Sequence, residues 1–159
     1  MLPAKVDTIT FDESSHMGII VLAVKDMAVP IWVGLFEAQS ILLKLQGTPF
    51  PRPLTHDLLR NSIQKLSGKL EYVYINDIKD GTFYAQIHLK QDGKKKVIDS
   101  RPSDAIALAV RADIPIYVDE KVYRTSRVDK KELMKEQKEK MYKAYLESLG
   151  DDEIGKLKH

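Results

Sequence analysis

In the first third of the chain, the pattern of hydrophobic and polar residues is typical of β-strands up to residue 33 and of an α-helix after it. Residues 6–11 alternate between apolar and polar side chains, and residues 17–24 form a nearly continuous apolar run rich in β-branched side chains. Both patterns, and the shorter apolar segment at residues 29–33, predict β-strands. Residues 35–46 carry apolar side chains at helical spacing, and Gly47 is typical of the position that follows a helix. This part of the chain therefore predicts three strands and then a helix.

Turn signals divide the middle of the chain. Thr55 is a favourable N-cap for a helix that reaches about residue 66, and Gly68 is expected to end it. Asp80-Gly81 and Asp92-Gly93 are typical of tight β-hairpins. The elements around these turns are predicted strands at residues 70–78, 82–90 and 95–99, a helix at residues 104–112 and a strand at residues 114–118.

The pattern repeats along the chain. Ile31 and Ile98 are 67 residues apart, and the same offset places Ala38 on Ala105, Ile41 on Leu108 and Lys44 on Arg111. Each half reads as strand, turn, strand and helix. We therefore predict an α+β fold, a two-layer α/β domain built from a duplicated strand-strand-helix unit.

The C-terminal part has a different composition. From Asp129 onward, charged residues dominate, and seven apolar residues share one helical stripe: Leu133, Met134, Met141, Tyr142, Tyr145, Leu146 and Leu149. We therefore divide the chain into a domain at residues 1–128 and a C-terminal part at residues 129–159, with an amphipathic helix and a loose tail. Because this stripe and the exposed sheet edges need cover, we expect a homo-oligomer.

Composition narrows the possible functions. The 159 residues carry a net charge of +2 and no cysteine, which excludes disulfides and thiolate metal sites. This charge is too small to indicate a nucleic-acid-binding protein by itself. No apolar run approaches the length of about 20 residues that spans a membrane, and the first residues do not resemble a signal peptide. We therefore expect a cytoplasmic protein without a membrane partner.

Short motifs for common cofactor and hydrolase chemistries are absent from the sequence. It contains no Walker-type phosphate loop, no dinucleotide-binding Gly-x-Gly-x-x-Gly, no His-Glu-x-x-His and no Gly-x-Ser-x-Gly. We therefore expect no organic cofactor.

Two segments carry the same arrangement of polar residues. Arg52-Pro53 and Arg101-Pro102 each precede a predicted helix, and a hydroxyl residue and an aspartate follow. A helix N-terminus attracts anions, and an arginine beside it adds a planar donor for phosphate oxygens. Arg52, Arg101 and Ser103 are therefore candidate phosphate-binding residues.

The acidic residues of these segments, with one histidine, are candidates for phosphodiester chemistry. Histidine exchanges protons near neutral pH, so His56 is a candidate general acid or base. Carboxylates can hold a divalent metal that activates water, and we expect Mg²⁺ or Mn²⁺ if a metal is used. The candidate catalytic residues are His56, Asp57, Asp99 and Asp104, and the candidate metal ligands are Glu37, Asp57 and Asp104.

A structural explanation of the same residues is equally available. Asp57 and Asp104 lie in first helical turns, where aspartate stabilises a helix without any further role. Ser103 is an ordinary capping residue, and proline is common at a helix start.

Several segments together resemble the bifunctional nuclease domain family. They are Pro-Ile-Trp-Val-Gly at residues 30–34 with Glu37, and the segments at residues 52–58, 80–85, 98–109 and 115–118. The resemblance covers residues 6–118 and implies a fold made of a duplicated strand-helix unit. It also implies nuclease activity on DNA and RNA. The site residues named above follow from the residues themselves and not from the family.

Three functional hypotheses remain open. In the first, the chain is a nuclease, which requires the two segments to meet in one cleft. In the second, it is a non-catalytic nucleic-acid-binding or regulatory module, in which Arg52 and Arg101 pair with buried carboxylates. In the third, the same residues act on a small anionic metabolite in a closed pocket.

Overall fold

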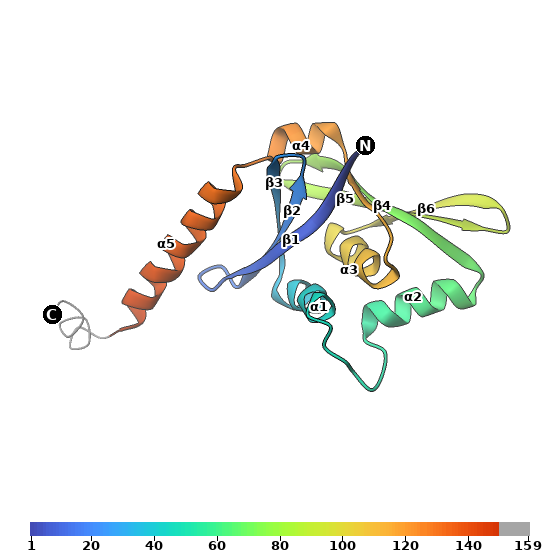
Figure 1. Cartoon of the computed structure of the whole chain (residues 1–159), viewed down its shortest axis with the longest axis horizontal. Coiled ribbons are helices and arrows are strands. Elements are labelled where there is room, and N and C mark those ends of the chain that lie inside the picture. Colours follow the sequence, from blue (N-terminus) through green and yellow to red (C-terminus); the bar gives the residue numbers. More distant parts are fainter. Residues whose placement is uncertain (150–159) are drawn as a thin grey trace.

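One mixed sheet of seven strands forms the centre of the molecule. The computed structural model describes residues 1–149. The strands are β1 (Leu2–Asp12), β2 (Met17–Val24), β3 (Met27–Gly34), β4 (Gly68–Lys79), β5 (Thr82–Gln91), β6 (Lys94–Ser100) and β7 (Ile116–Val118). The helices are α1 (Leu35–Leu45), α2 (Thr55–Lys65), α3 (Pro102–Ala112), α4 (Glu120–Ser126) and α5 (Lys130–Ser148). This content confirms the predicted α+β class (Figure 1).

The sheet is built from two copies of one unit. Its strand order is β3-β2-β1-β7-β4-β5-β6, and all neighbours are antiparallel except β4 and β7. A shift of 67 residues turns the bounds of α1 into those of α3, and it moves the start of β3 to the start of β6. The predicted duplication is therefore confirmed. Each unit contains three strands and a helix, one strand more than the strand-strand-helix unit, although all three strands of each half were predicted from the sequence.

Helices and strands form two layers around a continuous core. α1, α2 and α3 lie together on one face of the sheet (Figure 1). The core contains the inward side chains of the strands and the apolar faces of α1 and α3, including Ile20, Ile31, Val73, Ile106 and Leu108. On the other face, Leu133 of α5 packs with Ile19 and Val21 of β2.

The N-terminal end of β2 is in very close contact with α1. A β-carbon at Gly18 would lie 2.2 Å from the β-carbon of Ala38. Two small residues therefore let α1 approach β2, and this approach helps to set the position of the α1 N-terminus.

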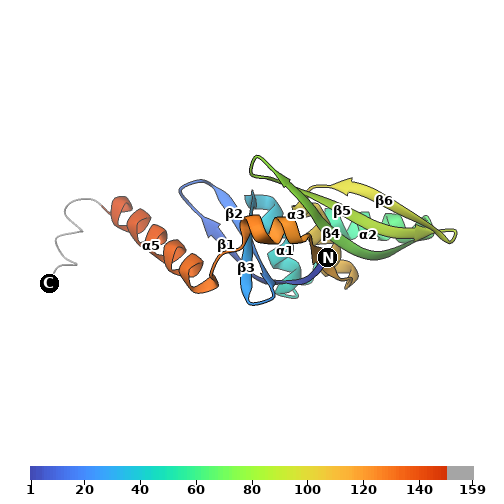
Figure 2. The same ribbon diagram turned by 90° about the horizontal axis from the view of Figure 1, so that it is seen from above.

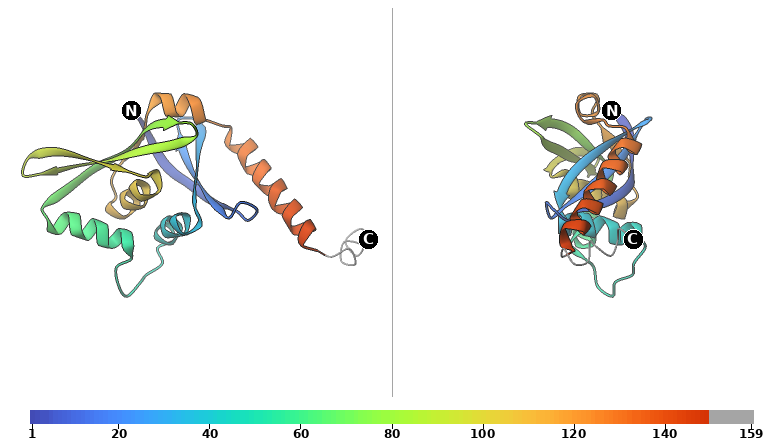
Figure 3. Two further views of the ribbon diagram at one scale, coloured as in Figure 1. Left: turned by 180° about the vertical axis from the view of Figure 1, so that it is seen from behind. Right: turned by 90° about the vertical axis from the view of Figure 1, so that its left-hand side faces the viewer.

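α5 confirms the predicted C-terminal helix, but three of the seven residues of its apolar stripe are exposed. Leu133 is 5% exposed, whereas Met141 is 59%, Tyr142 64% and Tyr145 55% exposed. Figures 2 and 3 show α5 extending away from the body at the end opposite the β5–β6 hairpin. The chain reaches α5 through a backbone bridge between Ala28 of β3 and Val128. The division at residue 128 stays a prediction, and the tail beyond residue 149 lies outside the described residues.

Some helix boundaries differ from those predicted. The N-cap of α2 is Leu54 and not Thr55, because the Asp57 carboxylate accepts a hydrogen bond from the Leu54 backbone N–H at 3.0 Å. Ser67, and not Gly68, takes the left-handed conformation after this helix, with φ 62°. Both predicted hairpin turns are confirmed, since Asp80-Gly81 and Asp92-Gly93 all have positive φ. No helix among residues 1–149 has the length and apolarity needed to cross a membrane.

The tight contact between β2 and α1 gives a first prediction. Gly18→Ala should lower the free energy of unfolding by about 1–3 kcal/mol, because its new methyl group overpacks Ala38. Ala38→Gly should cost about 1 kcal/mol through helix propensity. The double variant should lose less than the sum of the two single variants, because the glycine restores the space. Urea unfolding of all four proteins measures this coupling, and strictly additive losses would show that the contact does not limit the packing.

Candidate functional site

The first turns of three helices bring four charged or titratable residues together. Arg101 immediately precedes α3, Asp104 lies in its first turn, Glu37 lies in the first turn of α1 and His56 in that of α2. The Arg101 guanidinium donates to Asp104 through Nε at 2.8 Å and Nη2 at 3.2 Å, and to Glu37 through Nη1 at 3.2 Å. His56 Nε2 lies 2.9 Å from Asp104 Oδ1. We call Glu37, His56, Arg101 and Asp104 the Arg101 cluster.

His56 is held by hydrogen bonds on both sides of its ring. Its Nδ1 lies 3.1 Å from Ser40 Oγ, and its Nε2 faces the Asp104 carboxylate, which only accepts. A neutral imidazole protonated on Nε2 satisfies both contacts, with the Ser40 hydroxyl donating to Nδ1. The His56 side chain is only 12% exposed, so its orientation is fixed by these two partners.

A buried guanidinium continues this network away from the Arg101 cluster. The Arg111 side chain is 1% exposed and lies between α1, α2 and α3. It donates to Asp57 Oδ1 at 3.1 Å, to the Ala107 carbonyl at 3.0 Å, and to both the carbonyl and the hydroxyl of Ser40. Ser40 therefore connects Arg111 to His56.

Sequence reasoning missed both residues of this connection as functional candidates. Arg111 lies in the last turn of α3. A basic residue is favourable there because it interacts with the helix dipole, so its presence needed no functional explanation. Ser40 is one small polar residue on a helix with no motif around it. The only signal was an arginine directly after the apolar run at residues 105–110.

Electrostatics favour the charged forms of Asp104 and Arg101. Burial acts to raise the pKa of Asp104, but hydrogen bonds from Arg101 and His56 outweigh burial and hold that pKa below its ordinary value. Asp104, and then Glu37, raise the pKa of Arg101. Burial lowers the pKa of Arg111 against the opposing attraction of Asp57. The carboxylates of the cluster are therefore strongly engaged by arginine.

The remaining predicted site residues lie outside the Arg101 cluster. Asp57 is directed to Arg111, and Ser103 is 5% exposed in the first turn of α3. Asp99 pairs with Gln86 in the sheet register, while its neighbour Ser100 pairs with the core residue Ala85. Because successive side chains point to opposite faces of a strand, Asp99 faces away from α3. The two Arg-Pro segments are thus in contact through His56 and Asp104, and Asp99 takes no part in this contact.

The carboxylates expected to hold a metal are arranged around guanidinium groups. Glu37 and Asp104 share Arg101, and Asp57 binds Arg111. Among residues 1–149, no three His, Asp or Glu side chains are grouped so that they could hold a metal ion. A divalent ion would therefore have to displace Arg101 to use these oxygens, and the arrangement does not fit a preformed metal site.

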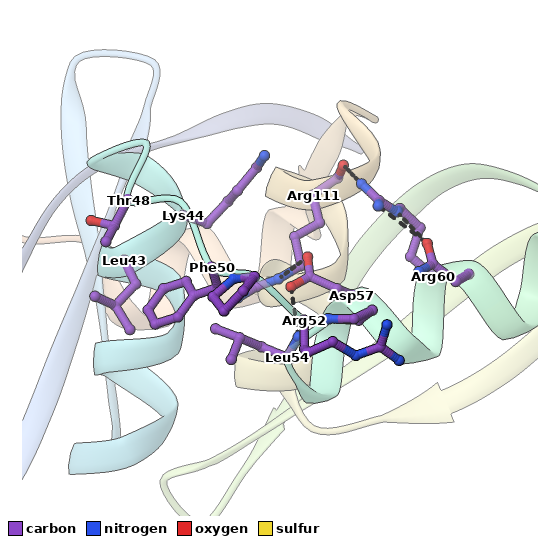
Figure 4. A pocket seen from close by; sticks show the side chains of 12 residues that line it. Leu43, Lys44, Thr48, Phe50, Arg52, Leu54, Asp57, Arg60 and Arg111 are labelled. Carbon is purple, nitrogen blue, oxygen red and sulfur yellow. Dashed lines mark hydrogen bonds and ion pairs between the residues drawn. The ribbon is translucent and has the colours of Figure 1, made fainter.

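A pocket of about 340 Å³ lies beside the Asp57–Arg111 pair. It is lined by residues of α1, α2, α3 and the linker between α1 and α2 (Figure 4). Arg52, the other candidate phosphate-binding arginine, belongs to this lining and not to the Arg101 cluster. We call it the basic pocket, and its lining residues are Leu43, Lys44, Thr48, Phe50, Pro51, Arg52, Pro53, Leu54, Asp57, Arg60, Asn61 and Arg111.

Known proteins with similar sequences include bacterial and plant chains. An uncharacterised protein of Mycobacterium tuberculosis is 46% identical over 97 residues, which cover 61% of this chain and 57% of that protein. Bifunctional nuclease 2 of Oryza sativa is 32% identical over 114 residues, 67% of this chain and 34% of the rice protein. Bifunctional nuclease 2 of Arabidopsis thaliana is 30% identical over 107 residues, 62% of this chain and 32% of the plant protein. The matches thus span less than two thirds of each relative.

The family model named bifunctional nuclease domain matches residues 20–131. This range includes the whole Arg101 cluster, the basic pocket and the network between them. It covers most of the chain, and the plant relatives carry the same name. The chain belongs to the bifunctional nuclease domain family.

Proposed function

We propose that this chain is a nuclease that hydrolyses phosphodiester bonds in DNA and RNA at the Arg101 cluster. One observation carries the proposal. His56 and Asp104, 48 residues apart in the sequence, form a hydrogen-bonded pair beside Arg101, whose side chain is 64% exposed. An exposed guanidinium beside a histidine–carboxylate pair supplies anion binding and proton transfer, which are two requirements of phosphodiester hydrolysis.

Arg101 would hold the phosphate. A guanidinium has five N–H donors, and the contacts within residues 1–149 use three of them, to Asp104 and Glu37. Two donors remain for phosphate oxygens, a bidentate geometry that suits this anion. Glu37 and Asp104 fix the plane of the guanidinium, so their role is to position Arg101.

His56 would move the proton. In the neutral ring protonated on Nε2, Nδ1 accepts from Ser40, and Asp104 stabilises the positive charge that the ring gains on taking up a proton. The low exposure of His56 requires that Ser40 relay the proton or that the ring turn outward when substrate binds. In the first route Asp104 stays hydrogen-bonded to Nε2 and orients the ring.

Divalent metal dependence stays a prediction of its own. Mg²⁺ or Mn²⁺ would supply charge neutralisation at the scissile phosphate. The guanidinium groups already occupy the nearby carboxylates, so no protein step described above depends on a metal.

A non-catalytic nucleic-acid-binding module is the alternative. It is favoured by the pairing of every candidate carboxylate of the cluster with arginine, and by the near burial of His56. In this alternative the same contacts join three helices, and no bond is cleaved.

Replacing Arg101 should reduce cleavage without unfolding the protein. Arg101→Gln should lower the cleavage rate of labelled single-stranded RNA and DNA by about 100-fold or more, because a positioned charge at the phosphate is lost. Its exposed side chain leaves the core intact. Arg124→Gln is the matched control, since Arg124 is similarly exposed and, within residues 1–149, binds only Glu120 on α4. Parallel reactions with Mg²⁺, Mn²⁺ and EDTA measure metal dependence.

Two results would contradict this proposal in different ways. Equal cleavage by wild type and Arg101→Gln would place the activity elsewhere or in a contaminant. Absence of cleavage by wild type in every metal condition would remove the nuclease proposal. Fluorescence anisotropy of the same labelled strands would then test the binding module directly.

Self-association is the second proposal, and it rests on α5. The exposed side chains Met141, Tyr142 and Tyr145 lie on the part of this helix that extends from the body. A second copy of the chain offers the same stripe, so two helices can cover each other in a symmetric contact.

Sedimentation velocity measures this association. At tens of micromolar protein, the wild type should have an apparent mass above the 18.1 kDa of its monomer. The double variant Tyr142→Ser with Tyr145→Ser should have the mass of the monomer. Glu136→Ser is the control on an exposed position of the same helix. A monomeric wild type at these concentrations would exclude the homo-oligomer.

A further inference from the structure

We propose that the basic pocket binds a single nucleotide, with the phosphate held by its cationic side chains and the base against Phe50. The pocket is separate from the Arg101 cluster, whose four residues do not line it. Nucleotide binding here does not require that the chain cleave any bond.

The positive charge of the pocket favours binding of an anion. Lys44, Arg52, Arg60 and Arg111 line it together with one carboxylate, Asp57. Asp57 forms its ion pair with Arg111, so it does not neutralise the other three cations. Within residues 1–149, neither Lys44 nor Arg52 forms an ion pair, and Arg60 binds only neutral oxygens, those of Asn61 and of the Arg111 carbonyl. Three cationic side chains therefore line one cavity, and none of them has a carboxylate partner among residues 1–149.

The arginines of the pocket are better suited to bind a phosphate group than to bind a diffuse negative surface. Arg60 uses three of its five N–H groups on Asn61 and the Arg111 carbonyl, which fixes the guanidinium and leaves two donors. Arg52 projects from the linker, and Lys44 comes from the last turn of α1 (Figure 4). Figure 4 shows Lys44 and Arg52 pointing to different sides of the pocket, so these two exposed side chains would turn inward to share one phosphate group with Arg60.

The walls of the pocket suit a nucleobase. Phe50 is 45% exposed, and Leu43 and Leu54 add apolar surface. Aromatic side chains stack on the faces of nucleic-acid bases, whatever the base. A volume of about 340 Å³ lies at the lower end of the usual range for small-ligand pockets, roughly 300–1,000 Å³. It suits one nucleotide and not a duplex.

The linker is stiff before any ligand arrives. Pro49, Pro51 and Pro53 alternate with Phe50 and Arg52. Each proline fixes its own φ and restricts the residue before it, so the two ligand-facing residues have little backbone freedom to lose. Preorganisation of this kind lowers the entropic cost of binding.

Isothermal titration of the full chain tests the proposal. The probes are adenosine monophosphate, adenosine and inorganic phosphate, each titrated separately at low salt. The monophosphate should bind at least ten-fold more tightly than either fragment, because only it uses both the cations and Phe50. Raising the salt concentration should weaken its binding.

Three variants separate the two halves of the pocket. Lys44→Gln combined with Arg52→Gln should weaken monophosphate binding at least ten-fold, and both side chains are exposed, so the fold should survive. Phe50→Leu should weaken monophosphate binding and leave phosphate binding unchanged. Lys95→Gln combined with Lys96→Gln on β6 removes the same charge from an exposed edge strand and should leave binding as in wild type.

A 5′-phosphorylated tetranucleotide distinguishes a free nucleotide from one unit of a strand. Binding of the tetranucleotide at least as tight as that of the monophosphate assigns the pocket to a strand end, and weaker binding assigns it to free nucleotide. Arg101→Gln should bind the monophosphate like wild type, so failure of the nuclease proposal and failure of this one give different results.

Any of three results would overturn the inference. The first is no heat of binding for the monophosphate. The second is equal loss in the β6 control and the Lys44/Arg52 variant, which would indicate general charge attraction. The third is equal affinity for a tetraglutamate peptide, which would make the pocket a site for acidic protein segments.

Discussion

The buried guanidinium of Arg111 is the interaction on which the arrangement of the helices depends. Its side chain is 1% exposed and reaches Asp57 of α2, the Ala107 carbonyl of its own helix and two oxygens of Ser40 on α1. A buried charge without such partners would cost several kcal/mol, on the order of 3–5 when one partner is removed. The relative positions of the three helices are therefore fixed by the hydrogen bonds of the Arg111 guanidinium. Their first turns then place Glu37, His56 and Asp104 within reach of Arg101.

Because Arg111 is central, the two candidate sites share a wall. Asp57 and Arg111 form one side of the basic pocket, while Ser40, which binds Arg111, also holds His56. Neighbouring residues of the α2 first turn thus face different sites, His56 the cluster and Asp57 the pocket. A ligand that pulled on Arg111 in the pocket would change the hydrogen bond to Ser40 and the orientation of His56. The basic pocket and His56 are therefore connected through one serine.

The sequence could predict the fold because its signals are local. Strand alternation, hairpin turns such as Asp80-Gly81 and the 67-residue repeat all act over short distances or recur in order, so the two units were visible before any contact was known. The site was only partly predictable. The link between Asp57 and Arg111 spans 54 residues, and each residue has a sufficient local role at a helix end. Asp99 differs from these residues: its neighbours in the sequence suggested the shared site, but strand alternation directs its side chain to the other face of the sheet.

The duplicated fold explains why the Arg101 cluster has two carboxylates and one arginine. The 67-residue offset relates Glu37 to Asp104 and Gly34 to Arg101. The equivalent carboxylates of the two units therefore meet at one guanidinium, because the first unit has glycine where the second has arginine. A β-carbon at Gly34 would lie 2.1 Å from Glu37 Oε2, so glycine makes room for Glu37. Lys44 and Arg111 are also equivalent, and both line the basic pocket. A nearly symmetric scaffold thus carries asymmetric chemistry, and the asymmetry comes from single residues at related positions.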